Sequence, residues 1–598
     1  MNLAVTTEFS PEDNIPPVGF IEKQDGIYYE VQKQNGDLLE VWLCSPLRVD
    51  ALVRDGSGHG WSRRVIVTDP EGRTHECVVT NASLANSKNL VLKQLSHLGL
   101  ELAPGNAARN TLIELLQAWK PHTTLTSTAR LGWTDDSCAA FVLGNGRIIG
   151  EQSFIFMNTG ADTIAANVKS AGTLAEWKAE VGARCADNPL LVAGVSLALS
   201  GPLLELLEAD GGGLHLRGKS SRGKSTILRA AVSVWGHPDL LQTWRATANG
   251  LEGVAAACNG TLLALDELGL ISPRDAFEAI YMLADGKGKS RADATGRAKP
   301  ILTWRLPILS SGEISLAAKI AEGGRTAMAG QNVRLLDIVA DGRCNGAFDE
   351  LHGAVNGAAF SNQMKEATAN AYGTAGPRFA EVLLRYSRNH IVNHYRRQME
   401  NFQKEAEKKY ELTTDGQIAR AVSRFGLIAL AGELATLANI TGWDKHSATQ
   451  AALILLGEWL EGRDHNEPDE IHATVDRTER FLSINSGRFK LFDGEPLKDQ
   501  AGYQDNEMFY VSPDIWRNIH RGHSAEKAAQ HLESSGFLMR GDNKNLARKL
   551  PRAANPDRPR HYCVRKSIIG IGVTSSERSD QSDIFEKQLF AGALGHHA

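Results

Sequence analysis

Short runs of alternating apolar and polar residues dominate the first part of the chain. Between residues 20 and 80 these runs flank turn signals such as Gln34-Asn35-Gly36-Asp37, a pattern that predicts antiparallel strands. Apolar positions at helical spacing follow around Leu90 to Leu98 and Thr111 to Trp119, and strands then return. We therefore expect residues 15–160 to form an α+β domain.

The most apolar run, Leu190 to Leu207, is interrupted by Gly201 and Pro202 and contains Glu205. This composition predicts two buried helices and argues against a membrane span. The helices lead into residues 170–340, where apolar strands alternate with helices. That alternation predicts an α/β domain with a parallel sheet.

A glycine-rich loop lies between the first of these strands and a helix. Leu214 and Leu216 alternate in the strand, and Ile227 and Ala231 recur at helical spacing after the loop. The loop fits the Walker A pattern G-x-x-x-x-G-K-S/T. The residues expected to bind ATP are Gly218, Lys219, Ser220, Ser221, Arg222, Gly223, Lys224, Ser225 and Thr226.

The residue types in this loop suit a phosphate site. Glycines let the backbone close on the phosphates, and the N–H groups at a helix start attract negative charge. We expect Lys224 to reach the β and γ phosphate oxygens and Ser225 to offer its hydroxyl to Mg2+. The alternative is a glycine-rich turn with a surface lysine.

Two carboxylates end the next apolar strand, Thr261 to Leu265. We expect Asp266 to hold Mg2+ through its water shell and Glu267 to polarise the attacking water. A glutamate directly after the metal-binding aspartate favours an additional-strand P-loop ATPase of the AAA+ type over a small-molecule kinase. The alternative is a strand end that is acidic by chance.

A third apolar strand is predicted at Ile301 to Leu309, with Ser310 to Glu313 at its end. Ser311 is the candidate sensor of the γ-phosphate. Pro307 offers no donor to the strand ladder, so we expect this strand to be incompletely paired.

A cationic segment separates the acidic strand from the sensor strand. Residues 285–299 contain five basic and two acidic side chains with three glycines, which predicts a flexible hairpin or loop. In superfamily 3 ring ATPases a hairpin at this place enters the central channel, and by that analogy the candidate nucleic-acid contacts are Lys287, Lys289, Arg291 and Arg297. A lysine that reaches a neighbour's ATP and a plain surface loop are the alternatives.

Arg325 and Arg334 are both candidates for an arginine finger. Such a residue neutralises charge on the γ-phosphoryl group of the ATP that a neighbouring subunit binds. Arg334 is preferred over Arg325 because it directly precedes an apolar strand. Arg420 or Arg424 is a candidate contact to the nucleotide of the same subunit.

Helical spacing and charge predict the domains that follow residue 340. Amphipathic helices fill a lid or connector at 341–490, and two helices with two strands predict a winged-helix-like domain at 505–570. Between Arg540 and Lys566 nine basic residues stand against two acidic ones, which indicates either phosphate contacts or a solvated wing packed on a neighbouring subunit. The polar tail, 571–598, is expected to be mobile.

Composition adds few constraints. The 598 residues are 42% hydrophobic and 23% charged, with a net charge of -5, as in soluble globular proteins of several domains. The N-terminus shows no apolar signal-peptide segment, and the seven cysteines include no C-x-x-C pair. We therefore expect a cytoplasmic location and no membrane partner, zinc site or disulfide framework.

Together the motifs resemble one family. The segments that carry the resemblance are Gly218 to Ser225, Thr243 to Thr247, Asn249 to Glu252, Leu265 to Leu268, Leu309 to Glu313, Gln331 to Leu335 and Arg424 to Ala429. They are similar to the domain of unknown function family DUF927, roughly over residues 15 to 570. Its members are regarded as superfamily 3-like AAA+ helicases of phages, plasmids and genomic islands. Ser311 stands where better-known superfamily 3 sensors have an asparagine.

The resemblance implies a homo-hexameric ring that uses ATP and Mg2+ to translocate on DNA, single-stranded in the central channel, during replication of a mobile element. No primase motif is visible, so the implied partners include a separate primase or initiator. Two other functions stay open. One is a DNA-bound AAA+ switch, a replication initiator or defence ATPase that does not unwind DNA, and the other is a P-loop kinase.

Overall fold

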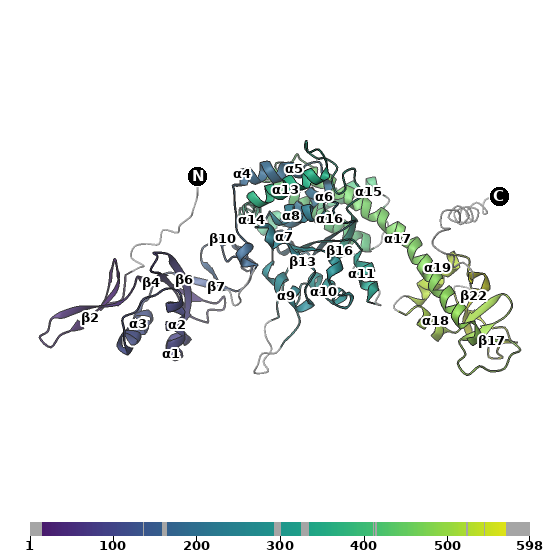
Figure 1. The fold of residues 1–598 in the computed structure, drawn as a ribbon, viewed down its shortest axis with the longest axis horizontal. Helices are drawn as coiled ribbons and strands as arrows, with labels where there is room; N and C mark the ends of the chain where they lie inside the picture. Colours follow the sequence, from purple (N-terminus) through teal and green to yellow (C-terminus); the bar gives the residue numbers. More distant parts are fainter. Residues whose placement is uncertain are drawn as a thin grey trace. The chain divides into compact units, whose positions relative to one another are not determined.

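The computed structural model describes residues 15–135, 137–157, 164–291, 301–323, 334–410, 412, 416–521, 524–542 and 545–569. Arg297, Arg325 and the tail 571–598 lie outside these residues. The chain divides into two compact units, the first ending at Gly457 and the second beginning at Glu458. The elements of both units are labelled in Figure 1.

Antiparallel strands form most of the N-terminal part of the first unit. The strands are β1 Phe20–Lys23, β2 Gly26–Gln32, β3 Leu38–Cys44, β4 Leu47–Arg54, β5 Ser62–Thr68, β6 Thr74–Thr80, β7 Thr124–Thr128, β8 Gly132–Trp133, β9 Ala140–Val142, β10 Ile148–Gly150 and β11 Phe154–Phe156. They pair in the orders β1-β2-β3, β11-β7-β4-β5-β6 and β10-β9-β8. The helices are α1 Asn81–Asn86, α2 Lys88–His97 and α3 Asn106–Ala118. The strands and helices expected in this region are thus present.

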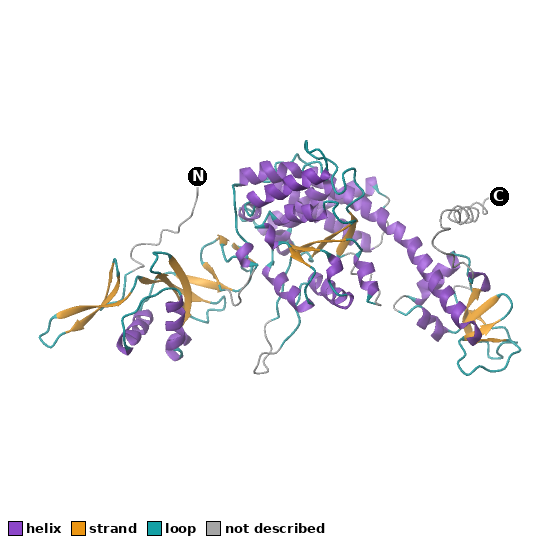
Figure 2. Cartoon of the chain, in the orientation of Figure 1, coloured by secondary structure: helices purple, strands orange, loops and turns teal. Residues whose placement is uncertain are grey.

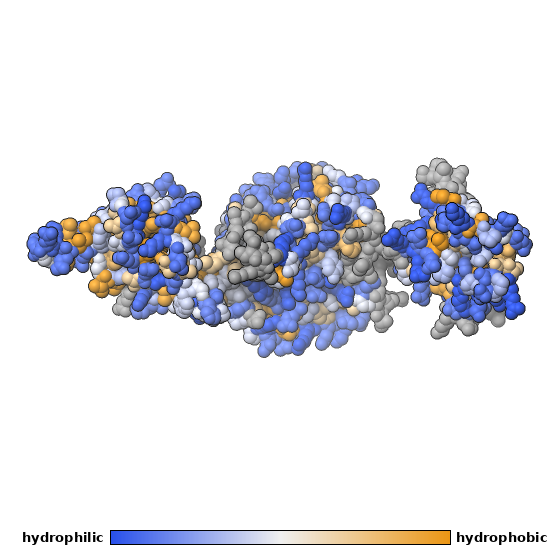
Figure 3. All heavy atoms as spheres, turned by 90° about the horizontal axis from the view of Figure 1, so that it is seen from below, coloured by the Kyte–Doolittle hydropathy of each residue, from blue (hydrophilic) through white to orange (hydrophobic). Residues whose placement is uncertain are grey.

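The helices of this region cover one face of its largest sheet. Val65, Val67, Leu95 and Leu112 belong to one buried cluster, because alternate strand positions and one helix stripe face each other. The hairpin of β2 and β3, at the left of Figure 3, carries apolar side chains on the surface. The exposed ones are Val31, Leu38 and Leu39.

Short helices lead to the next sheet. They are α4 Leu174–Trp177, the π-helical η3 Lys178–Gly182, α5 Ala183–Cys185, α6 Pro189–Leu199 and α7 Gly201–Leu206, after the short η2 Ala165–Asn167. α6 and α7 are buried, which confirms the two helices predicted for the most apolar run. Among the described residues, no helix is both long and apolar enough to cross a bilayer.

A parallel sheet forms the centre of the first unit, as predicted. Its strands are β12 Gly212–Arg217, β13 Gln242–Thr243, β14 Leu263–Asp266, β15 Pro307–Gly312 and β16 Leu335–Val339, in the order β13-β14-β15-β12-β16. All four pairings are parallel. The carboxyl ends of the strands therefore meet at one edge of the sheet, which we call the carboxyl edge, and their starts meet at the amino edge.

Helices cover both faces of this sheet (Figures 1 and 2). α6 and α8 Lys224–Val232 pack on one face. The other face packs in one apolar cluster against α9 Ala248–Ala257, α10 Pro273–Asp285 and α11 Leu316–Glu322. The short η4 Pro238–Leu240 and η5 Leu268–Leu270 lie in the connections. Helices after the sheet complete the unit: α13 Gly357–Asn370, α14 Ala375–Leu383, α15 Arg388–Lys409 and α16 Gly416–Leu437.

The second unit is built on a mixed sheet. Its strands are β17 Phe489–Leu491, β18 Gly502–Gln504, β19 Met508–Val511, β20 Leu538–Met539, β21 Arg548–Lys549 and β22 Arg560–Arg565. Its helices are α18 Pro513–Ile519, α19 Ala525–Ser534, the second part of α17 Ser447–Asn485, and the short η6 Ser486–Arg488 and η7 Lys566–Ile568. Trp516, Leu532 and Phe509 lie in its core. The boundary between the units thus falls inside the expected connector, 341–490.

Candidate nucleotide-binding site

The predicted phosphate loop connects β12 to α8 at the carboxyl edge. Two of its residues have left-handed backbone, Ser221 with φ 58° and Gly223 with φ 101°. A Cβ at Gly223 would lie 2.5 Å from Phe348 Cζ, so the close approach and the positive φ both require glycine there. The backbone N–H groups at the start of α8 follow the loop directly, and those of Thr226 and Ile227 donate to the Gly223 carbonyl at 3.1 and 3.3 Å.

The Lys224 side chain folds back inside the loop. Its Nζ donates to the carbonyl oxygens of Gly218 and Lys219, each at 2.7 Å, and the residue is only 8% exposed. An ammonium group held there lies among the loop's own acceptors. Phosphate oxygens could take the place of these carbonyls without moving the charge out of the loop.

Asp266 is the point where three elements meet. It ends β14, and its Oδ2 accepts from Ser225 Oγ of α8 at 2.8 Å. Its Oδ1 accepts a hydrogen bond from Ser311 Oγ of β15. A carboxylate and a hydroxyl are the hard oxygen ligands that Mg2+ prefers, so Ser225 and Asp266 fit the predicted metal site. The structure therefore brings together three residues that lie far apart in sequence.

The sensor strand begins later than predicted. The sequence pattern predicts a strand at Ile301 to Leu309, but β15 starts at Pro307 and ends at Gly312. Proline donates nothing to a ladder and is tolerated as the first residue of a strand. Ser311 consequently lies within the paired strand, and it is 1% exposed.

Glu267 follows Asp266 in a left-handed conformation, with φ 60° and ψ 66°. Such a conformation costs a non-glycine residue about 1 kcal/mol or more and is common at functional sites. The residue is exposed, and the turn after it is held by Lys319, whose Nζ donates to the Gly269 carbonyl at 3.1 Å. Glu267 thus combines an unusual backbone conformation with an exposed side chain beside Asp266.

A segment after β16 braces the phosphate loop, and the sequence analysis did not predict it. Asp341 Oδ2 accepts from the Lys219 backbone N–H at 2.8 Å. The Ala347 N–H donates to the Arg222 carbonyl at 2.8 Å, and Phe348 packs against Gly223. An isolated aspartate after an apolar strand was the sequence signal for this brace.

Arg334 lies at the amino edge, opposite the phosphate loop. Its neighbour Leu335 pairs with Gly213 at the start of β12, whereas the loop follows the end of that strand. The guanidinium is 3.8 Å from Asp285 and stacks at 4.8 Å over the Tyr281 ring. The side chain is 32% exposed. It is therefore not sealed in the core, and it does not contact its own phosphate loop.

Arg424 also lies at the amino edge, which corrects the prediction that it contacts the nucleotide of its own subunit. Its guanidinium donates to the Gly211 carbonyl at 3.0 Å. Burial, together with the nearby charge of Arg334, lowers the pKa of Arg424 to about 10, against the opposing effect of Asp210. Arg420, one turn earlier on α16, is exposed.

The described part of the cationic segment, residues 285–291, pairs with the residues that follow the segment. Lys287 bridges to Thr303, and the Gly288 N–H donates to the Leu302 carbonyl at 2.8 Å. These contacts support the predicted hairpin, whose residues 292–300 lie outside the described part. Lys287 and Lys289 are exposed, and Lys289 pairs with Glu278 at 3.0 Å.

Arg291 is engaged inside its own unit. It donates to both carboxylate oxygens of Glu252, at 3.1 and 2.7 Å, and to Asn249 at 3.1 Å. The Glu252 side chain is 1% exposed. Arg291 therefore neutralises a buried carboxylate, a role that the count of basic residues did not indicate.

Residues 20–302 match the family model described as a domain of unknown function, DUF927. The matched part contains the N-terminal sheets, the phosphate loop, Asp266 and Glu267. It ends before β15, so the resemblance expected for residues 15–570 is confirmed for this part only. No curated protein sequence matches the chain.

Among solved structures, the chain is similar to the SCCmec type IV Cch active helicase, with a TM-score of 0.64 and 18% identity over 92% of this chain and 99% of that one. At this identity the likeness establishes the fold and not the activity. NtrX from Brucella abortus aligns over 38% of this chain and 44% of its own, with 17% identity. Its TM-score of 0.17 is too low to support an argument.

Arg291→Ala is expected to lower the free energy of unfolding by about 2 kcal/mol, because the buried Glu252 carboxylate loses its cation. Lys289→Ala serves as the control, since its pair with Glu278 is half-exposed and is worth under about 1 kcal/mol. Urea unfolding measures both changes. An Arg291→Ala protein as stable as the parent, with weaker DNA binding, would instead support the predicted nucleic-acid contact.

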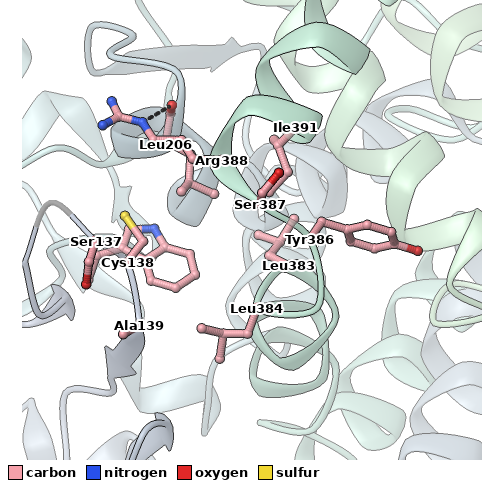
Figure 4. A pocket seen from close by; sticks show the side chains of 11 residues that line it. Ser137, Cys138, Ala139, Leu206, Leu383, Leu384, Tyr386, Ser387, Arg388 and Ile391 are labelled. Atoms are coloured by element: carbon pink, nitrogen blue, oxygen red, sulfur yellow. Dashed lines mark hydrogen bonds between the residues drawn. The ribbon is translucent and has the colours of Figure 1, made fainter.

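A cavity of about 210 Å³ lies away from the phosphate loop. Trp133, Cys138, Leu383 and Arg388 are among the side chains that line it, and Figure 4 shows Arg388 donating to the Leu206 carbonyl. None of the predicted site residues is among the side chains that line this cavity.

Proposed function

We propose that this protein is a Mg2+-dependent ATPase of the AAA+ type that drives a DNA helicase or translocase. The observation that carries the proposal is the junction at Asp266, where hydroxyls from the phosphate-loop helix and from the sensor strand meet one carboxylate. A P-loop sequence can occur by chance, but this convergence of Ser225, Asp266 and Ser311 needs the correct fold.

Each of these residues has a chemical task in the proposed reaction. Lys224 and the loop N–H groups bind the β and γ phosphates, and Glu267 accepts hydrogen bonds from the attacking water. Ser225 and Asp266 would hold Mg2+, which neutralises charge on the phosphate oxygens when bound. Ser311 links the metal-site carboxylate to the strand that senses the γ-phosphate.

The topology supports the AAA+ assignment. β15 lies between the phosphate-loop strand β12 and the acidic strand β14, which is the inserted strand that gives additional-strand P-loop ATPases their name. The helices after β16 would form the lid. The described fold also resembles that of the SCCmec type IV Cch active helicase.

The place of Arg334 supports assembly into a ring, which we propose is a hexamer. Because it lies at the edge opposite its own phosphate loop, it can act as a finger only on the triphosphate of another copy. A partly exposed guanidinium beside Tyr281 and Asp285 is available for such a contact.

Two cationic surfaces would hold DNA. Lys287 and Lys289 belong to the hairpin proposed to enter the central channel. In the second unit, which we propose is a winged helix, residues 545–569 contain one acidic residue and these exposed basic ones: Arg548, Lys549, Arg552, Arg558 and Arg565. Such a surface suits phosphate contacts. By the family resemblance, we propose that the protein acts in the replication of a mobile element, together with a separate primase or initiator.

Strand displacement on forked DNA tests this function. We expect Mg2+ and ATP to release the displaced strand, with single-stranded DNA stimulating ATP hydrolysis. Stimulated hydrolysis without a displaced strand would favour the alternative, a DNA-binding AAA+ switch that acts as an initiator or defence ATPase.

A further inference from the structure

A chain of buried polar side chains lies behind the catalytic carboxylates. Trp244 Nε1 donates to Ser310 Oγ at 2.9 Å, and Ser310 Oγ lies 2.9 Å from His215 Nδ1. His215 Nε2 lies 3.0 Å from the Ile314 carbonyl oxygen. Trp244, Ser310 and His215 are all 0% exposed. Burying a polar group costs free energy unless the group is hydrogen-bonded. We therefore expect these three side chains to keep the hydrogen-bonding arrangement described here.

The direction of the hydrogen bonds in this chain is fixed. A carbonyl only accepts, so His215 Nε2 carries the proton that goes to Ile314. In the neutral ring Nδ1 then accepts a hydrogen bond, which the Ser310 hydroxyl donates. The indole N–H of Trp244 can only donate, so Ser310 Oγ accepts from Trp244 and donates to His215. Burial lowers the pKa of His215, and Arg217 and Lys224 lower it further, whereas Asp337 and the hydrogen bond to the Ile314 carbonyl raise it; the net lowering favours this neutral state.

This row of hydrogen-bonded side chains connects β12, β14 and β15, the strands that carry the site. Trp244 follows β13, and its backbone N–H donates to the Asp266 carbonyl at 3.0 Å. His215 lies in β12, just before the phosphate loop, whose Gly218 N–H donates to the Gly312 carbonyl at 3.1 Å. Ile314 precedes Ser315, the N-cap of α11.

Ser310 and Ser311 work on opposite faces of β15. Successive side chains of a strand point to opposite sides, so Ser310 reaches the α9–α11 face while Ser311 reaches Asp266. Hydrogen bonds from Ser310 to Trp244 and His215 therefore restrain the backbone of β15, the strand from which Ser311 reaches Asp266.

We propose that Trp244, Ser310 and His215 form a positioning chain for ATP hydrolysis, which holds Ser311 and Asp266 in register with the phosphate loop. This inference rests on the proposed ATPase function. None of the three touches the site where the triphosphate would bind. Losing the chain should thus slow turnover and leave nucleotide affinity nearly unchanged.

The test compares two serine substitutions of matched chemistry in the full-length protein. Ser233 Oγ also accepts from a tryptophan, Trp177 Nε1 at 2.9 Å, and is also 0% exposed, but it lies at the far end of α8. Ser310→Ala and Ser233→Ala each leave one buried indole N–H without its acceptor. We expect Ser310→Ala to lower kcat by about 10- to 100-fold, with Kd for ATP within about threefold of the parent. Ser233→Ala should keep the parent's kcat.

His215→Asn gives a second measurement. The asparagine side chain offers Ser310 an acceptor oxygen but cannot also donate to Ile314, so we expect a smaller fall in kcat than for Ser310→Ala. If Ser310→Ala and His215→Asn both have the same kcat as Ser233→Ala, the proposed positioning role of these residues is wrong. The proposed ATPase function would be unaffected by that result. If the parent protein does not hydrolyse ATP at all, the proposed ATPase function is overturned, and the positioning role of Trp244, Ser310 and His215 is overturned with it.

Discussion

Glu267→Gln protein is expected to bind ATP as tightly as the parent and to hydrolyse it about a thousandfold more slowly. The amide has the size of the carboxylate but is a far weaker base, so it cannot polarise the attacking water. Binding should persist because Glu267 is exposed and the phosphate contacts come from the loop. Phosphate release gives kcat, and a fluorescent ATP analogue gives Kd.

Glu366→Gln is the matched control for this change. Glu366 is an exposed residue of α13, outside the site, and its substitution should leave kcat at the parent's value. Turnover by Glu267→Gln at the parent's rate would remove Glu267 from the mechanism and point to a different base.

Lys224→Ala should weaken ATP binding by at least about a hundredfold, because a charge-assisted contact to phosphate in a partly desolvated loop is lost. The substitution also removes the donor to two loop carbonyls, so the loop itself loses its internal closure. Equilibrium binding of the fluorescent analogue measures the change.

Lys365→Ala, at an exposed position of α13, controls for the loss of one positive charge. It should bind ATP like the parent. An unchanged affinity in Lys224→Ala would place the triphosphate somewhere other than the Gly218 to Thr226 loop.

The sequence predicts those parts of the site whose chemistry is local. The phosphate loop is one contiguous motif, and Asp266 with Glu267 ends one apolar strand, so residue type and spacing were enough. The start of β15 was predicted too early, because apolar residues before Pro307 look like a strand although the ladder begins at the proline.

Contacts between distant segments could not be predicted in the same way. Asp341 reaches a loop residue 122 positions away. Ser310 and His215 are 95 positions apart and bond only because their strands are neighbours. Arg424 shows the converse: its place on a predicted lid helix indicated a nucleotide contact, but that face of the helix packs at the amino edge. Strand order decides the first two contacts and helix packing decides the third, and sequence spacing determines neither.

The most direct test of the proposed motor is a structure of the protein with Mg2+, a non-hydrolysable ATP analogue and single-stranded DNA. We expect a closed ring in which the triphosphate lies on Gly218 to Thr226 of one copy and Arg334 of the next copy approaches its γ-phosphate. A nucleotide-bound monomer, or a ring in which Arg334 stays beside its own Asp285 and Tyr281, would contradict the account.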